Sequence, residues 1–200
     1  MFPESISELE ALYRASFDAA EKALKRFERI DSKTLLSTIN QLRYAARHHL
    51  DSTVATSDAD RREKLIQAIS HCRRAEYDAV DSSVVMVGKA IVRFSDRYQL
   101  QTILAVMPDF SKYYAEAQKS MAILRNAGSA QEIVRATDER AVALESLLKF
   151  WADIQAKQLL VKQYEEQRLA EKQHAFRMWL IGIVISLLAL CVSIVTGLLH

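Results

Sequence analysis

The chain has 200 residues and a formal net charge of +2, with only four glycines and two prolines. A β-sheet protein of this length needs many turns, and turns are built mainly from Gly, Pro, Asn and Asp. The composition therefore argues against all-β, collagen-like and low-complexity chains. Because 50% of the residues are hydrophobic, a folded core is expected rather than a disordered chain. The small net charge gives no strong signal for DNA binding.

Helical spacing of apolar residues predicts an all-α fold, an elongated helical bundle of about five helices. Ser5 and Glu8 form a capping box at the start of a first helix that runs to about Ile30. A second helix follows and ends within the polar cluster at residues 51–57. Its inward face is predicted to hold Leu35, Ile39, Leu42, Ala46 and Leu50.

A long third helix is expected to begin at Ser57 or Asp58 and to reach Val106. Gly88 or the Ser95–Asp96 pair is expected to kink or divide it, because glycine and paired polar residues weaken a helix locally. Apolar residues that include Leu65, Ile69, Val84 and Ile91 trace one face of this helix, which is therefore expected to be buried.

Two further helices are predicted beyond it. Asp109 caps a fourth helix to Ala127, and Ser129 with Glu132 forms a second capping box at the start of a fifth. No helix breaker follows, so the fifth helix is expected to run from about residue 130 to the end of the chain. Its expected core residues are Leu144, Leu147, Leu148, Trp151 and Ile154, with Val161 and Tyr164 as the last contacts.

The end of the chain, Trp179 to Leu199, contains no charged residue. A helix of this length spans about 31 Å, which matches the apolar thickness of a bilayer. The sequence therefore predicts that the last helix continues into a single C-terminal transmembrane helix. Lys and Arg precede this segment and none follows it, so the positive-inside rule places the N-terminus in the cytoplasm.

Three parts of the chain follow from this topology. Residues 1–160 are expected to form a cytoplasmic helical bundle, residues 161–178 a polar juxtamembrane stalk, and residues 179–199 the transmembrane helix. The arrangement is that of a single-pass, tail-anchored protein, and the bacterial inner membrane is the expected location. In a reducing compartment Cys72 and Cys191 are expected to be free thiols, with Cys72 in the core.

Small residues recur at helical spacing within the apolar segment. They are Gly182, Ser186, Ala189, Ser193 and Gly197. A stripe of small residues lets two helix backbones approach closely, so it predicts packing between copies of this helix and a homo-oligomer. Such a contact could also line a narrow polar path through the membrane. The alternative is that these residues are simply common in membrane helices.

Arg43 and His48 stand five positions apart on the second predicted helix. A histidine can move the proton of an RNA 2′-hydroxyl, and an arginine can stabilise the phosphorane that forms. In an all-α chain this Arg-x4-His spacing resembles the HEPN family of small helical dimers. The resemblance implies a metal-independent ribonuclease with Arg43 and His48 as its catalytic pair. The alternative is a solvated face formed by Arg43, Arg47 and His48.

A second polar patch lies on the third predicted helix and holds His71, Arg73, Arg74 and Asp78. Adjacent arginines beside a histidine favour a ligand that carries phosphate. The alternative is a helix face held by ion pairs, since Arg74 and Asp78 are four residues apart. The chain has no glycine-rich phosphate loop, Cys-x-x-Cys or His-Glu-x-x-His motif, so neither a metal nor another cofactor is predicted.

These features favour a membrane effector that oligomerises and perturbs the bilayer as a pore or by depolarisation. The architecture resembles HEPN-like accessory proteins of CRISPR-type bacterial antiviral defence. Whether the trigger is an RNA, a nucleotide or a protein stays open at this point. The first alternative is a membrane-tethered ribonuclease of the HEPN type. The second is a tail-anchored scaffold or adaptor without catalysis. The lipid bilayer is an expected partner in all three, and enzymatic activity is expected only in the ribonuclease.

Overall fold

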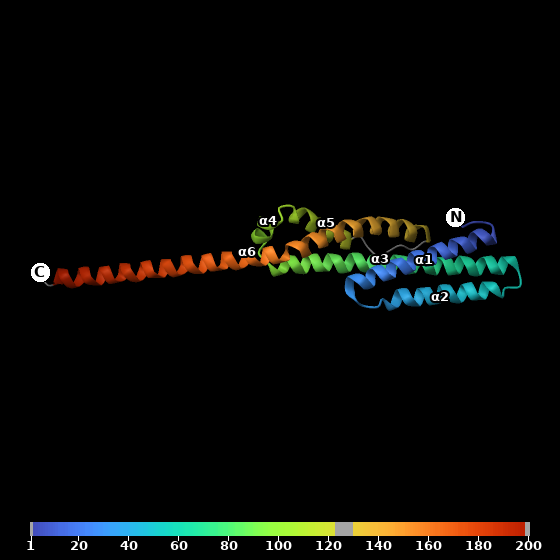
Figure 1. The fold of residues 1–200 in the computed structure, drawn as a ribbon, viewed down its shortest axis with the longest axis horizontal. Coiled ribbons are helices and arrows are strands. Elements are labelled where there is room, and N and C mark those ends of the chain that lie inside the picture. Colours follow the sequence, from blue (N-terminus) through green and yellow to red (C-terminus); the bar gives the residue numbers. More distant parts are fainter. Residues whose placement is uncertain (1, 123–129, 199–200) are drawn as a thin grey trace.

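The computed structural model describes the backbone of residues 2–122 and 130–198, and the side-chain surroundings of residues 2–122 and 132–188. All regular structure within these ranges is helical, which confirms the all-α class. The six helices are α1 (Ile6–Asp31), α2 (Leu36–Thr53), α3 (Asp58–Arg97), α4 (Leu100–Val106), α5 (Phe110–Ala122) and α6 (Ala130–Leu198). They form an elongated bundle from which α6 projects far to one side (Figure 1).

Helix α3 is the scaffold of the bundle and takes part in two hydrophobic cores. Its N-terminal part packs with α1 and α2 around Leu9, Leu65 and Ile69, which are fully buried. Its C-terminal part packs with α4, α5 and α6 around Ile91 and Leu144, among others. Full burial of one such side chain contributes about 1.5–3 kcal/mol. The two cores therefore attach the other five helices to α3.

The predicted starts and ends of the first helices are confirmed. The Ser5 hydroxyl accepts a hydrogen bond from the Glu8 backbone N–H at 3.3 Å and donates to the Glu8 carboxylate at 2.7 Å. Ser32 ends α1 in the left-handed conformation, with φ of 52°, and its N–H donates to the Glu28 carbonyl. Ser57 caps α3 by accepting from the Asp60 N–H at 3.2 Å. Each cap satisfies a helix-end group that would otherwise lack a partner.

The predicted inward face of α2 is wrong at one residue and shifted overall. Leu50 is 62% exposed, and the fully buried positions are Thr38, Ala45 and Ser52. These side chains are small, so α2 approaches α3 closely. The apolar spacing of α2 alone could not show this, because the register also depends on the side chains that α3 presents.

The long third helix is divided directly after the predicted Ser95–Asp96 pair, whereas Gly88 does not interrupt it. Helix α3 ends at Arg97, and Tyr98 and Gln99 adopt extended backbone before α4 begins. Gly88 stays helical because it serves a packing contact. A Cβ atom there would lie 2.6 Å from the Met121 sulfur of α5. The division gives six helices in the described chain rather than about five.

We expect the effect of Gly88→Ala on stability to depend on Met121. Alanine is favoured over glycine inside a helix by about 1 kcal/mol, but its Cβ collides with the Met121 side chain. The change in the free energy of unfolding caused by Gly88→Ala should therefore be at least about 1 kcal/mol more stabilising in a Met121→Ala background than in the natural chain. Urea unfolding of the four members of this cycle measures the difference, and equal effects in both backgrounds would contradict the contact.

Helix α6 is continuous from Ala130 to Leu198, as predicted, while Gly128 and Ser129 fall outside the described residues. Its contacts with the bundle continue beyond the predicted boundary at residue 160. Val161 is fully buried, Thr102 donates to the Glu165 carboxylate, and Arg168 donates to Gln101 at 3.4 Å. All side chains of residues 169–188 are exposed, and this end of α6 projects from the bundle (Figure 1).

In the part of the chain that the structure describes, no helix is sufficiently long and apolar to cross a membrane. The transmembrane helix predicted at residues 179–199 is therefore not supported by the fold and stays a prediction. Side chains are described as far as Leu188, so the second half of the predicted segment lies beyond them.

Candidate functional site

His48 and His71, which belong to two separate polar patches in the sequence, meet at the interface of α2 and α3. The rings of His48 and His71 stack with centroids 5.2 Å apart and planes 8° from parallel. The Tyr44 ring lies 5.5 Å from the ring of His71. The Gln41 side-chain oxygen lies 2.7 Å from His71 Nδ1. With that oxygen as acceptor, Nδ1 carries the proton and a neutral His71 has its lone pair on Nε2.

The environment of His71 favours its neutral ring. Burial lowers the pKa of His71, and the nearby His48 lowers it further because two imidazolium charges would repel. His48 Nδ1 is buried and has no hydrogen-bond partner in the described residues. The neutral His71 ring then offers Nε2 as a hydrogen-bond acceptor.

Acidification is expected to destabilise the bundle through His71. Its pKa is lower in the folded chain than in the unfolded chain, so the unfolded chain binds more protons below about pH 6.5. This contribution to stability is present above that pH and is lost as the pH falls through the folded pKa. The free energy of unfolding in urea should fall less between pH 7.5 and pH 5.5 for His71→Gln than for the natural chain. His174→Gln, on the exposed part of α6, should behave like the natural chain, and equal losses for all three would contradict the argument.

Arg43 does not share this interface with His48. It lies on the outer surface of α2, where Asn40, Arg43, Tyr44 and Arg47 line a hollow of about 250 Å³. Its guanidinium donates to the Asn40 side-chain oxygen at 3.3 Å, while Arg47 pairs with Asp51 at 3.1 Å. Among the residues described, no hydrogen bond or ring contact joins Arg43 to His48. The structure therefore places the predicted catalytic pair on two different faces of α2.

The predicted ligand-binding set on α3 is likewise divided. His71 faces α2, whereas Arg74 pairs with Asp78 at 3.0 Å along α3 and lies 5.5 Å over the ring of Tyr77. Burial raises the pKa of Asp78, and the attraction of Arg74 opposes that rise. Arg73 points to another side, where its guanidinium lies 5.0 Å over the ring of Phe2. The four groups therefore have partners on different sides of α3.

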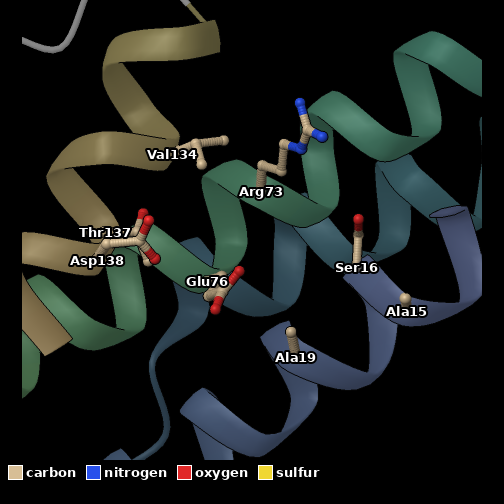
Figure 2. A pocket seen from close by; sticks show the side chains of 8 residues that line it. All are labelled: Ala15, Ser16, Ala19, Arg73, Glu76, Val134, Thr137 and Asp138. Atoms are coloured by element: carbon tan, nitrogen blue, oxygen red, sulfur yellow. The ribbon is translucent and has the colours of Figure 1, made fainter. Parts of the chain in front are cut away.

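Arg73 also borders a hollow of about 220 Å³ between α1, α3 and α6 (Figure 2). The lining residues are Ala15, Ser16, Ala19, Arg73, Glu76, Val134, Thr137 and Asp138. Burial raises the pKa of Glu76, and the nearby carboxylate of Asp138 raises it further against a weaker opposing effect of Arg73. No sequence pattern indicated this pair of carboxylates, because they lie far apart in the chain and meet only through packing.

Cys72 and Tyr13 lie in the adjoining core. The Cys72 thiol is free and buried, as predicted, and burial raises its pKa to about 12. A thiol of this kind is not a nucleophile at neutral pH. Tyr13 stacks on His49 with centroids 4.3 Å apart, a contact that the sequence did not indicate.

The structure describes the surroundings of two positions in the stripe of small residues on α6, Gly182 and Ser186. The Ser186 hydroxyl donates to the Gly182 carbonyl of its own helix at 2.8 Å. Among the described residues, no atom outside the local backbone lies within 4 Å of a Cβ built on Gly182. Space for a close neighbour is therefore present there. The side chains of Ala189, Ser193 and Gly197 lie outside the described residues.

No protein-family model matches the chain, and comparisons with curated proteins and with solved structures also return no match. Among the described residues, no three His, Cys, Asp or Glu side chains are grouped so as to hold a metal ion.

Proposed function

We propose that this chain is a membrane-anchored helical effector of bacterial antiviral defence. In this proposal the bundle lies in the cytoplasm and the end of α6, from Trp179 onward, lies in the bilayer. Assembly of several copies brings their membrane helices together and perturbs the membrane as a pore or by depolarisation. The resemblance of the architecture to HEPN-like defence proteins supports the biological setting, and the apolar end of α6 supports the mechanism.

The observation that carries the proposal is the set of apolar side chains exposed on every side of α6 between Phe176 and Leu188. They are Phe176, Met178, Trp179, Leu180, Ile181, Ile183, Val184, Ile185, Leu187 and Leu188, each between 36% and 61% exposed. Soluble monomers rarely expose so large a continuous apolar surface. In sequence the charge-free run continues to Leu199, and lipid is the environment that covers such a helix on all sides.

Helix α6 also offers a mechanical connection between the two ends of the molecule. One helix carries buried core residues at Leu144 and Ile154 and continues without interruption to the apolar segment. Association of bundles would therefore fix the positions of the attached membrane helices. Open space beside Gly182 would let those helices pack closely.

The ribonuclease alternative receives less support from the geometry. It needs Arg43 and His48 to act on one phosphodiester, but Arg43 lies on the outer surface of α2 and His48 stacks on His71. A second copy would have to complete the site. An adaptor without catalysis needs neither a catalytic pair nor packing between membrane helices. This alternative predicts that the chain alone leaves membranes intact.

Release of a trapped dye from lipid vesicles tests the proposal directly. Purified full-length chain should release the dye, Gly182→Leu should reduce release at least about tenfold, and the matched change Ile183→Leu should leave it unchanged. His48→Ala should also release the dye normally. If the natural chain releases no dye but cleaves RNA, and His48→Ala loses that cleavage, the ribonuclease alternative is established instead.

A further inference from the structure

The turns of α6 that precede the apolar segment carry positive charge without a compensating acid. From residue 172 to the end of the chain the only Lys and Arg residues are Lys172 and Arg177, and there is no Asp or Glu. Neither residue has a carboxylate three or four positions away, the spacing at which helix neighbours pair. Both side chains are exposed, and neither forms an ion pair or hydrogen bond within the described residues. Their charges are therefore available to an anion outside the chain.

The unpaired state is confined to this part of the helix. The three Lys and Arg residues that precede Lys172 on α6 all have partners. Lys157 and Lys162 lie 2.9 and 3.8 Å from a carboxylate one turn away, and Arg168 donates to Gln101 of α4. The two cations without a partner are thus the two that lie nearest to the apolar segment.

Both unpaired cations lie close to the level at which we place the membrane surface. With a rise of 1.5 Å per residue, Arg177 lies about 3 Å and Lys172 about 10 Å before Trp179 along the helix. Exposed charges interact over about 8–10 Å at physiological salt. The rings of Phe176 and Trp179, on either side of Arg177 in sequence, stack with centroids 5.8 Å apart. Aromatic rings of this kind favour the level of the lipid headgroups.

We propose that Lys172 and Arg177 bind the phosphate groups of anionic phospholipids, so that α6 gathers these lipids where it enters the bilayer. The assignment rests on the proposed function, because it needs Trp179 to lie at the membrane surface. Arginine can donate two hydrogen bonds to one phosphate, and the lysine ammonium acts as a point charge. The two residues are about 140° apart around the helix, so each contacts a different lipid.

Quenching of Trp179 fluorescence by brominated lipids identifies the lipids that surround it. The full chain with Trp151→Phe is placed in two kinds of vesicle with the same ratio of phosphatidylglycerol to phosphatidylcholine. Bromine is carried by the first lipid in one kind and by the second lipid in the other, at equal mole fractions. Brominated phosphatidylglycerol should quench at least about threefold more effectively, because cations beside a membrane attract anionic lipids. Molar sodium chloride should remove the difference, since salt screens exposed charges.

Two double variants test whether these particular cations are responsible. In Lys172→Gln combined with Arg177→Gln, the two brominated lipids should quench equally, and the fold should be intact because both side chains are exposed and unpaired. Lys157→Gln combined with Lys162→Gln is the matched control. It removes the same charge from the same helix, but at residues that already pair with carboxylates, so the preference for phosphatidylglycerol should remain.

The outcomes separate this assignment from the proposed function. Equal quenching by both lipids before residues 172 and 177 are changed, or an undiminished preference after they are changed, would overturn the assignment alone. Absence of quenching by either lipid would overturn the assignment together with the membrane location of Trp179. A preference that inorganic phosphate removes, but that sodium chloride of the same ionic strength does not, would overturn lipid binding in favour of a free phosphate.

Discussion

Replacing Arg140 with alanine is expected to lower the free energy of unfolding by about 3–5 kcal/mol. Arg140 is 5% exposed on α6, and its guanidinium reaches both of the neighbouring helices. One nitrogen lies 2.8 Å from Asp81 of α3, an ion pair rather than an aligned hydrogen bond. Another donates to the Ser120 carbonyl of α5. Alanine would leave a carboxylate and a carbonyl without their partner and would open a cavity in the interface.

The measurement is urea unfolding followed by circular dichroism, with Arg135→Ala as the matched control. Arg135 is on the same helix and also pairs with a carboxylate, but its side chain is 83% exposed. Its substitution should change stability by less than about 1 kcal/mol, because exposed ion pairs contribute little. Equal effects of the two substitutions would show that Arg140 does not hold α6 to α3 and α5.

The second large effect is expected from charge in the apolar part of α6. Ile185→Arg combined with Leu188→Arg places two guanidinium groups within the segment that we propose to lie in lipid. Each charge costs up to about 3 kcal/mol near the centre of a membrane helix. The chain should therefore move from the carbonate-resistant membrane pellet to the supernatant, with at least a tenfold fall in the pelleted fraction.

Leu159→Arg is the control for this experiment. Leu159 is 63% exposed on the same helix, but it lies before the apolar segment, so arginine there faces water in either state. That variant should pellet like the natural chain. A double-arginine chain that still pellets normally would indicate attachment through another surface.

Much of the fold could be predicted because its signals are local. Caps at Ser5 and Ser57 and the spacing of Leu144, Leu147 and Ile154 depend on residues within a few turns of one another, and the structure confirms them. The inward face of α2 and the helical state of Gly88 depend on α3 and α5 respectively. Patterns within one helix cannot report such partners.

The candidate sites could be predicted only in part for the same reason. The sequence drew attention to His48 and His71 separately, but their stacking required the packing of α2 on α3. It also suggested that Arg43 and His48 act together, whereas helical geometry places them on different faces. Glu76 and Asp138 each look like an ordinary surface acid in sequence. Only the fold brings them to one hollow (Figure 2).

The central claim, that α6 ends in lipid, is tested most directly through Trp179. The chain has two tryptophans, and Trp151→Phe leaves Trp179 as the sole indole, at the start of the apolar segment. In vesicles that contain lipids brominated along their acyl chains, its fluorescence should shift to shorter wavelength and be quenched, because an indole at the membrane interface contacts those lipids. Emission typical of water that brominated lipids leave unquenched would contradict the claim.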